Sequence, residues 1–362
     1  MSATFETGTA VPQPLVISID AMGGDHGPSV VVPGVARASL QASGRQIRYL
    51  LHGDEALIAP ELAKWAGARQ LCEIRHTTQV IAMTEKPAQA LRRGKGSSLW
   101  NAIESIRKGE AHAAVSAGNT GALMAIGKLI LRTIEGLDRP AIVASWPTSR
   151  GVTAVLDVGA NVTSEAEQLV EFAILGEAFH RAVYGTPRPT VGLLNVGSED
   201  IKGHEEVREA HKLLREVGLD LDYRGFVEGD GIAKGSVDVV VTDGFTGNIA
   251  LKTAEGMARF FSQLLRETLT SDLQAKVGAL IATPALQRMR ARIDPSSVNG
   301  GPLLGLKGLV VKSHGGADAR GFANAIKVAA DLAASDYAVE VERNLRVLTA
   351  ALKPAEPAVA QA

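Results

Sequence analysis

The stretch of the sequence best suited to chemistry runs from Val115 to Leu123, Val-Ser-Ala-Gly-Asn-Thr-Gly-Ala-Leu. It follows apolar residues that are typical of the end of a buried strand, and it precedes an apolar run that predicts a helix over 122–131. Glycine lets backbone N–H groups turn toward a ligand, and free N–H groups at a helix start bind anions. An anion site and an ordinary strand–turn–helix corner would share this composition. The residues expected to contact the anion are Ser116, Gly118, Asn119, Thr120 and Gly121.

A second glycine-rich turn follows the first predicted strand, residues 15–19, and begins at Asp20. Residues 21–28 contain three glycines, which let the backbone approach a ligand closely. Pro28 is typical of the first position of a helix, and apolar residues over 30–40 predict that helix. The residues of this turn expected to bind substrate are Asp20, Gly23, Gly24 and Asp25.

A basic segment over residues 84–98 precedes a predicted helix at 99–108. Lys95 offers a cation, and the Gly-Ser-Ser sequence after it offers a flexible turn with two hydroxyls. We therefore expect Lys95 and Ser98 to bind substrate. The alternative for Arg92, Arg93 and Lys95 is a solvated charged face, which is the more common role of such a run.

Three further predicted strands, at 152–156, 190–194 and 237–241, also end in polar residues with glycine nearby. Helical patterns separate these strands. Because ligands bind at the carboxyl ends of the strands in a parallel sheet, the polar ends predict one shared crevice. The polar strand ends include Asn161, Asn195, Lys202, Asp243, Gly244 and Asn248.

One internal similarity links two of these turns. Residues 109–121 align without gaps to residues 235–247, and both stretches carry an apolar strand, a hydroxyl residue and two glycines before a helix. Two such helix starts could face each other across the crevice. Alternatively, the similarity reflects turn chemistry that α/β folds reuse without a shared purpose.

The alternation of strands and helices predicts an α/β fold, a three-layer α/β/α sandwich with a mostly parallel sheet. The 362 residues suffice for one large domain, and we expect a single α/β domain over 15–350. Tails at 1–14 and 353–362 are polar or Pro/Ala-rich and are expected to be mobile. The last apolar pattern predicts a long helix over 319–345.

The composition favours a cytoplasmic protein. The net charge of −1 argues against a nucleic-acid partner. The single cysteine, Cys72, excludes an intramolecular disulfide and fits a reducing compartment. The sequence contains no signal-peptide pattern at 1–14 and no apolar run long enough to span a membrane. It also lacks a metal-ligand spacing, and Gly23-Gly24-x-x-Gly27 departs from the dinucleotide motif, so no metal or cofactor is expected.

Residues 256–294 interrupt the alternation with helically spaced apolar residues and no strand pattern. Pro284 is expected to separate two helices. An apolar tip flanked by basic residues has the composition of an interfacial membrane anchor, although a helix pair buried against a second subunit would look similar, and a dimer bundle could do both. The apolar tip residues are Val277, Leu280, Ile281 and Leu286, and the basic flank is Lys276, Arg288, Arg290 and Arg292.

Six motifs occur in a specific order: Ile19–Asp25, Ser116–Leu123, Leu156–Asn161, Leu193–Gly197, Asp243–Asn248 and Ser313–Gly315. Together they resemble the bacterial phosphate acyltransferase family, the acyl-carrier-protein–phosphate transacylases of phospholipid synthesis, over residues 15–345. Two departures are Thr163-Ser164-Glu165 where the family usually has Asp/Lys-Pro-Glu, and Lys202-Gly203-His204 where it often has Lys-Gly-Asn. No specific role is therefore assigned to residues 163–166 and 204.

The resemblance implies an enzyme that converts long-chain acyl-ACP (acyl carrier protein) and inorganic phosphate into acyl phosphate and ACP. The acyl phosphate would pass to a membrane glycerol-3-phosphate acyltransferase, on the way to phosphatidic acid. The resemblance also implies a homodimer, peripheral association with the inner face of the membrane, and a fold like those of phosphotransacetylases and isocitrate or isopropylmalate dehydrogenases.

For this reaction an enzyme must mainly align the two substrates and stabilise the oxyanion. No Ser–His–Asp order and no reactive cysteine is evident, so direct displacement is favoured over an acyl-enzyme. We expect residues 116–121 to cradle phosphate and Lys202 to supply a cation. Asn161 and Asn195 would donate to the thioester carbonyl, and Asp243 would orient phosphate or its proton. The two histidines that could assist the leaving thiolate, or be merely structural, are His26 and His314.

Three alternatives remain at this point. A phosphotransacetylase acting on a short acyl-CoA would share the fold but would not need the apolar, basic-flanked tip. A decarboxylating dehydrogenase of similar fold would need a set of metal-binding carboxylates that is missing here. A non-catalytic membrane adaptor for lipid synthesis would bind lipid through residues 276–292 and transfer no acyl group.

Overall fold

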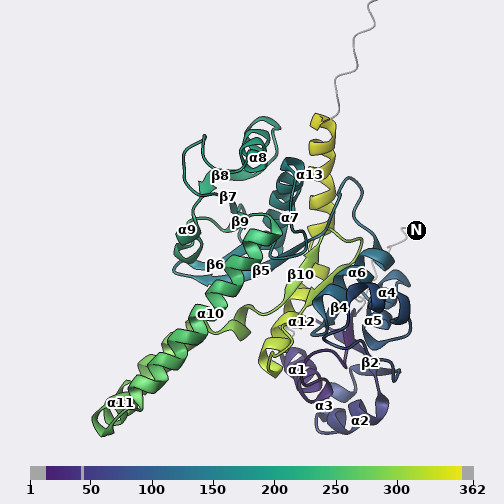
Figure 1. The fold of residues 1–362 in the computed structure, drawn as a ribbon. Coiled ribbons are helices and arrows are strands. Elements are labelled where there is room, and N and C mark those ends of the chain that lie inside the picture. Colours follow the sequence, from purple (N-terminus) through teal and green to yellow (C-terminus); the bar gives the residue numbers. More distant parts are fainter. Residues whose placement is uncertain (1–13, 42–44, 353–362) are drawn as a thin grey trace, which may run out of the picture.

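A single mixed sheet of eleven strands forms the centre of the molecule (Figure 1). The computed structural model describes residues 14–41 and 45–352, so the tails at 1–13 and 353–362 lie outside the described residues, as do the side chains of residues 290–293. The strands are β1 (Leu15–Asp20), β2 (Ile47–Gly53), β3 (Cys72–His76), β4 (Ala113–Ser116), β5 (Ala141–Thr148), β6 (Gly151–Leu156), β7 (Thr190–Leu194), β8 (Asp222–Val227), β9 (Val239–Val241), β10 (Gly301–Leu304) and β11 (Leu309–Lys312).

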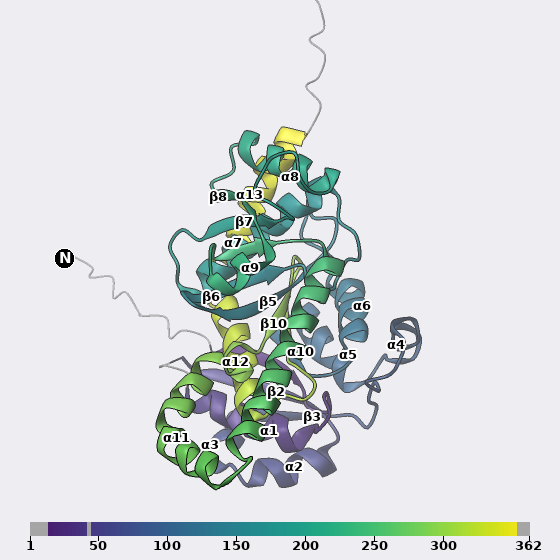
Figure 2. The same ribbon diagram turned by 60° about the vertical axis from the view of Figure 1, so that its left-hand side comes forward.

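Helices cover both faces of this sheet. They are α1 (Pro28–Leu40), α2 (Glu55–Ala63), α3 (Ala66–Arg69), α4 (Pro87–Arg93), α5 (Ser98–Arg107), α6 (Thr120–Leu131), α7 (Ala166–Tyr184), α8 (Glu205–Glu216), α9 (Gly229–Lys234), α10 (Gly244–Leu269), α11 (Leu273–Ile293), the 3-10 turn η1 (Pro295–Val298), α12 (Ala319–Ala333) and α13 (Tyr337–Leu352). One apolar core joins the sheet to α1, α7, α12 and α13, and a second joins its other face to α4, α5 and α6. The predicted three-layer α/β/α class is confirmed (Figures 1 and 2).

The strand order is β3-β2-β1-β4-β11-β10-β5-β6-β9-β7-β8. The first five strands run parallel to one another, and so do the last four. The intervening strands β10 and β5 make antiparallel pairs with their neighbours. Three antiparallel pairs in succession reverse the direction, so the two parallel halves of the sheet run in opposite senses.

This reversal decides where the polar strand ends lie. Register pairs Ser116 with both Asp20 and Lys312, so β1, β4 and β11 end on one edge of the sheet. Ala141, at the start of β5, pairs with Leu304, and Leu156, at the end of β6, pairs with Val143. The carboxyl ends of β6, β9 and β7 therefore lie on the opposite edge. The polar residues that the sequence predicts in one crevice thus form two groups.

Alternation along the strands directs the first of these groups toward one face. Ile17, Ile19 and Val115 face the core shared with α1 and α12, whereas Val310 faces the core shared with α5 and α6. Successive side chains of a strand point to opposite faces. By this alternation, the side chains of Asp20, Ser116 and Lys312 lie on the same face of the sheet as that of Val310. All three therefore point toward α5 and α6.

Two predicted helix boundaries are wrong. The long helix expected over 319–345 is two helices, with the break at Ser335 and Asp336. The Ser335 hydroxyl accepts from the Tyr337 N–H at 3.3 Å. Such side-chain bonds to the backbone compete with the hydrogen bonds of a helix. Pro284 does not separate helices either, since it lies inside α11. The break comes at Asp272, whose carboxylate accepts from the Ala275 N–H and begins α11.

Helices α10 and α11 form a hairpin that projects from the sheet (Figure 1). Val277, Leu280 and Ile281 are exposed, with Leu280 at 75% and Ile281 at 77%, whereas Leu286 is half-buried. Within the described ranges, no helix combines the length and apolar character needed to cross a bilayer.

Candidate active site

The two glycine-rich turns that follow β1 and β4 lie against each other. A side chain at Gly23 would come within 2.7 Å of the Gly118 nitrogen and 2.6 Å of the Asp20 carboxylate. Gly24 has a φ of +90°, a backbone conformation that residues with a Cβ rarely adopt. Only glycine therefore permits this contact, which joins the turn after β1 to the start of α6.

Asp20 and Ser116 form a buried pair at this contact. The Ser116 hydroxyl donates to Asp20 Oδ2 at 2.6 Å and accepts from the Gly118 N–H at 2.9 Å. Among the described residues, the second oxygen, Asp20 Oδ1, and the nearby Ser98 hydroxyl have no hydrogen-bond partner. Burial raises the pKa of Asp20, although Ser116, Ser98 and Lys312 each oppose that effect. A buried carboxyl with free bonding capacity is costly unless a ligand or water completes it.

Lys312 completes this group, and sequence reasoning missed it. The Lys312 ammonium donates to the carbonyl of Ala117, at 3.2 Å, and to that of Ser313. Burial lowers its pKa to about 8, against the opposing effect of Asp20 and Asp25. The available signal was the apolar strand Leu309–Val311 ending in a lysine next to Ser313-His314. Pairing of β11 with β4 then brings it to the glycine turn.

The turn after β11 is held by Asn299. Its side chain donates to the Ser313 hydroxyl at 2.9 Å and accepts from the His314 N–H at 3.0 Å. The Gly315 carbonyl in turn accepts from the Asp25 N–H at 3.0 Å. The ring of His314 is exposed, with its Nδ1 accepting from the Gly316 N–H. The predicted residues Asp25 and His314 therefore lie beside Lys312.

The side chain of Asn119 forms its hydrogen bonds within the protein, and its predicted contact with a ligand stays a prediction. Its Oδ1 accepts from the Ala122 N–H at 3.0 Å and caps α6. Its Nδ2 donates to three carbonyls, those of Ala82, Met83 and Glu85. The first hydrogen bond within α6 runs from the Leu123 N–H to the Asn119 carbonyl. The N–H groups of Thr120 and Gly121 precede it and are therefore the ones left to bind an anion at this helix start.

The second group of polar residues surrounds Asp157, directly after β6. Its carboxylate accepts from five donors: the N–H groups of Ile142, Gly159, Ala160 and Asn161, and the Asn161 side chain. The Asn161 amide also donates to the Pro140 carbonyl at 2.9 Å. Both Asn161 amide hydrogens therefore bond within the protein, and its predicted donation to a thioester carbonyl stays a prediction.

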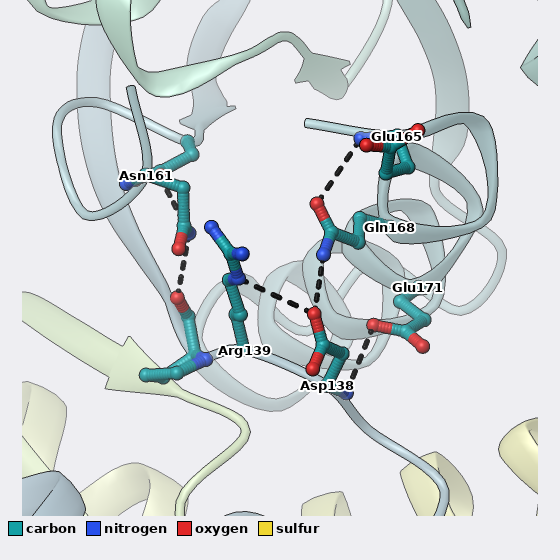
Figure 3. Close-up of polar contacts among 8 residues, drawn as sticks. Asp138, Arg139, Asn161, Glu165, Gln168 and Glu171 are labelled. Carbon is teal, nitrogen blue, oxygen red and sulfur yellow. Dashed lines mark hydrogen bonds and ion pairs between the residues drawn. The ribbon is translucent and has the colours of Figure 1, made fainter. Parts of the chain in front are cut away.

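A polar network supports this second group from outside (Figure 3). Asp138 accepts from the Gln168 amide at 2.5 Å and pairs with Arg139, and its N–H donates to Glu171. Burial raises the pKa of Glu171 to about 7. The Gln168 carbonyl accepts from the Glu165 N–H at the start of α7. The network fastens residues 138–140 to α7, and Pro140 is the carbonyl that Asn161 binds.

The start of α10 packs tightly on the Asp157 turn. A side chain at Gly244 would meet the Asn161 carbonyl at 2.2 Å. Asp243 caps the helix, accepting from the N–H and hydroxyl of Thr246, and the Asn248 amide donates to the Val158 carbonyl. Further along α10, Lys252 is near enough to lower the pKa of Lys312. This helix therefore runs from the second group toward the first.

Lys202 lies in an exposed loop after β7. Its ammonium pairs with Glu199 at 2.8 Å, and its side chain is 47% exposed. The Glu199 carboxylate raises the pKa of this lysine. Asn195 anchors the loop by donating to the Lys202 carbonyl at 3.0 Å and accepting from the Val196 N–H. The described contacts of Lys202 do not reach either glycine turn.

The remaining residues predicted to bind substrate differ in how deeply they are buried. Ser98 is buried beside Asp20, whereas Lys95 is exposed at the end of the basic segment. No group of three or more described His, Cys, Asp and Glu side chains is arranged to hold a metal ion. Cys72 lies in β3, where burial raises its thiol pKa to about 12, which disfavours the nucleophilic thiolate form.

The first group thus combines a cation, a buried carboxyl, hydroxyls and a free helix start. These are the components of a site that binds an anion and stabilises negative charge. Solved structures of similar fold include a phosphotransacetylase from Streptococcus pyogenes, with a TM-score of 0.60 and 18% identity over 89% of this chain and 95% of that one. A branched-chain phosphotransacylase from Enterococcus faecalis has a TM-score of 0.54 and 13% identity over 88% and 99%.

Sequence comparison is more specific. A model described as "Fatty acid synthesis protein" matches residues 15–340. A phosphate acyltransferase of Caulobacter vibrioides is 69% identical over 93% of both chains. Another, of Phenylobacterium zucineum, is 64% identical over 96% of this chain and 98% of that one. The chain belongs to the phosphate acyltransferase family, and it is an acyltransferase.

Proposed function

We propose that this enzyme makes acyl phosphate from inorganic phosphate and a long-chain acyl thioester carried by ACP. The observation that carries the proposal is the juxtaposition of Lys312 with the Asp20–Ser116 pair and the start of α6. The names of the relatives support phosphate as the acceptor. The exposed apolar tip supports a donor with a long, lipid-like chain.

Phosphate would bind between Lys312 and the first turn of α6. The ammonium supplies charge, and the free N–H groups of Thr120 and Gly121 point along the helix dipole. Asp20, with its raised pKa, can hold a proton and donate it to a phosphate oxygen. The close contact of Gly23 with Gly118 keeps both turns in place before the substrate arrives.

The reaction is a direct displacement. An oxygen of HPO₄²⁻ attacks the thioester carbonyl carbon, the C–S bond breaks, and the proton lost by phosphate is taken by the leaving thiolate. The products are acyl phosphate and the free thiol. Positioning and oxyanion stabilisation supply the rate enhancement, and the exposed His314 would relay the proton.

The second group has a supporting role in this proposal. Asn195 holds the loop after β7 by donating to the Lys202 carbonyl, and Asp243 and Lys202 lie on this same sheet edge, away from the phosphate. Asn161 contributes by holding the Asp157 turn on which α10 is seated. Because α10 begins on this turn and extends toward Lys312, the turn fixes where the helix lies relative to the first group.

A reconstituted assay tests the proposed reaction. Palmitoyl-ACP is incubated with and without phosphate, and acyl phosphate is trapped with hydroxylamine. We expect phosphate-dependent loss of the thioester and formation of the hydroxamate. Thioester loss that is independent of phosphate would overturn the proposal. A preference for acetyl-CoA over palmitoyl-ACP would instead assign the chain to the short-chain phosphotransacetylases, whose fold it shares.

The hairpin supports a homodimer and a cytoplasmic enzyme that associates peripherally with the membrane. Met257, Phe260, Phe261 and Leu264 are exposed along α10, and a second copy would cover them. Leu280 and Ile281 would enter the lipid interface, with Lys276 and Arg288 facing anionic headgroups. The product, a lipid-like acyl phosphate, would then be released close to a membrane glycerol-3-phosphate acyltransferase.

Vesicle sedimentation tests the tip. The substitution Ile281→Asp should abolish binding to anionic phospholipid vesicles, because it places a charge in the apolar interface. Phe260→Asp is the matched variant, which should disrupt the dimer measured by sedimentation equilibrium. Vesicle binding by Ile281→Asp at the wild-type level would contradict the membrane role.

A further inference from the structure

A cavity of about 390 Å³ opens beside the first polar group, between α4 and the loop at 79–85. Two connections show how close it lies. Ser97 lines the cavity, and the next residue, Ser98, is buried beside Asp20. The Glu85 side chain lines the cavity too, and its backbone carbonyl accepts from Asn119 at 2.8 Å. The cavity lining is therefore directly connected to residues that contact Asp20 and the start of α6.

The cavity lining suits a polar ligand that carries amide groups. The lining residues include two with side-chain amides and one with a guanidinium, together with a serine, a glutamate and two apolar residues: Gln79, Gln89, Arg93, Ser97, Glu85, Val80 and Ile81. Amides both donate and accept hydrogen bonds, so they match a chain of peptide-like groups better than they match a bare acyl chain. Arg93 adds a donor fork suited to a phosphodiester.

The segment over residues 85–95, called the rim below, supplies four of the lining residues and is strongly basic. Residues 85–95 contain four cations, Lys86, Arg92, Arg93 and Lys95, and one carboxylate, Glu85, for a net charge of +3, although the whole chain has a net charge of −1. All four cations are exposed. Within the described part of the chain, none of them forms an ion pair; the nearest carboxylate along α5, Glu104, pairs with Arg107 and Lys108. Uncompensated charge around a cavity marks a surface for a partner of opposite sign.

We propose that Lys86, Arg92, Arg93 and Lys95 dock an acidic carrier protein and that the cavity guides its amide-containing arm toward Lys312. This inference rests on the proposed function, since it names the surface that receives the thioester donor. The cations attract an acidic helix of the carrier, and the arm enters past Arg93 and Gln89. The thioester at its end then reaches the phosphate held at the start of α6.

The test compares two thioesters and two double variants. Lys86→Glu with Arg92→Glu reverses charge on the rim, and Lys212→Glu with Arg215→Glu makes the same charge change on α8, where both side chains are exposed. Each enzyme is assayed with acyl-ACP and with a soluble acyl-pantetheine, which has the arm without the acidic protein. The thermal midpoint confirms that each variant is folded.

We expect the rim variant to raise the KM for acyl-ACP at least thirtyfold and to change kcat/KM for acyl-pantetheine less than twofold. The α8 variant should match the wild type with both. Neutral variants, Lys86→Gln with Arg92→Gln, should show a smaller rise in KM for acyl-ACP. Raising the salt concentration should weaken the wild-type preference for acyl-ACP and leave the rim variant unaffected.

Equal KM values for acyl-ACP in the rim and α8 variants would overturn the docking surface. So would loss of binding to anionic vesicles in the rim variant with an unchanged KM, because that result would assign the cations to lipid. Failure of the wild-type enzyme to form acyl phosphate from either thioester is a separate result, which would overturn the proposed function itself.

Discussion

Asp20 and Asp157 are both buried aspartates at the carboxyl end of a strand, Asp20 as the last residue of β1 and Asp157 directly after β6, yet their surroundings differ. Asp157 accepts five hydrogen bonds, which occupy both of its oxygens. Asp20 accepts one side-chain bond, from Ser116, and its Oδ1 has no partner among the described residues. Burial raises the pKa of both carboxyls. A saturated carboxylate organises a turn, whereas an unsaturated one beside a half-buried cation is free to act on a ligand.

The lysines of the two groups differ in the same way. Lys312 is half-buried and donates to two backbone carbonyls, with no ion pair in the described structure. Lys202 is nearly half exposed and already paired with Glu199. A cation in a partly dry site interacts with an anion much more strongly than a solvated one does. The structure therefore favours Lys312 over Lys202 as the cation that meets phosphate.

The largest expected effect is on stability, at Asp157. Asp157→Ala would leave five donors without their acceptor, and each donor that is buried and finds no water costs about 1–3 kcal/mol. We expect urea denaturation to show that the free energy of unfolding falls by about 3 kcal/mol or more. Asp157→Asn, which keeps one acceptor oxygen, should lose less. A stable Asp157→Ala enzyme with low activity would reverse the assignment of the two groups.

Lys312→Met should lower the rate of acyl phosphate formation by about 10²–10³, as removal of one preorganised charge-stabilising donor does. Because the methionine side chain has a similar length and no charge, folding should be retained. Steady-state kinetics with varied phosphate measures the effect. Activity within a few-fold of wild type would exclude Lys312 from the site.

The pH dependence should report the same lysine. Burial lowers the pKa of Lys312 to about 8, so the charged form that binds phosphate is present below pH 8 and is lost above it. The apparent affinity for phosphate should therefore fall about tenfold per pH unit above this value. Lys312→Arg, which stays charged, should remove this basic limb. A limb that persists in the arginine variant would belong to another group.

Asp20→Asn should lower activity about tenfold with little change in stability. The amide keeps an acceptor for Ser116 and replaces a carboxyl whose charged form burial disfavours, so the free energy of unfolding should stay equal or rise. Parallel denaturation and kinetic measurements on Asp20→Asn and Asp157→Asn give a direct comparison. Equal losses of stability in both variants would erase the distinction between the two carboxyls.

The smallest expected effect is at Lys202. Lys202→Ala removes a solvent-exposed ion pair, which contributes little to stability, and we expect activity to stay within about tenfold of wild type. The sequence-based hypothesis of a catalytic Lys202 predicts complete loss instead. The kcat of this variant, compared with that of Lys312→Met, decides between the two lysines.

Local patterns in the sequence predict much of the fold. The strands at β1, β4, β6 and β7 and the helices α6, α7 and α8 follow from apolar spacing and turn residues, and so does the three-layer class. Ser335 and Asp272 mark helix breaks that the apolar pattern does not reveal, because a single capping side chain decides them. Strand β5, which carries the reversal of the sheet, has no alternating pattern and was not predicted.

The sequence by itself determined the two glycine turns, the family and the identity of most side chains at the first site. Only the tertiary structure decided which of them are free. Lys312 donates to the Ala117 carbonyl, 195 residues away in the sequence. The side-chain amides of Asn119 and Asn161 donate to carbonyls that lie outside their own motifs. Hydrogen-bond capacity is consumed by partners that the register of the sheet brings together, and that register is set by long-range packing.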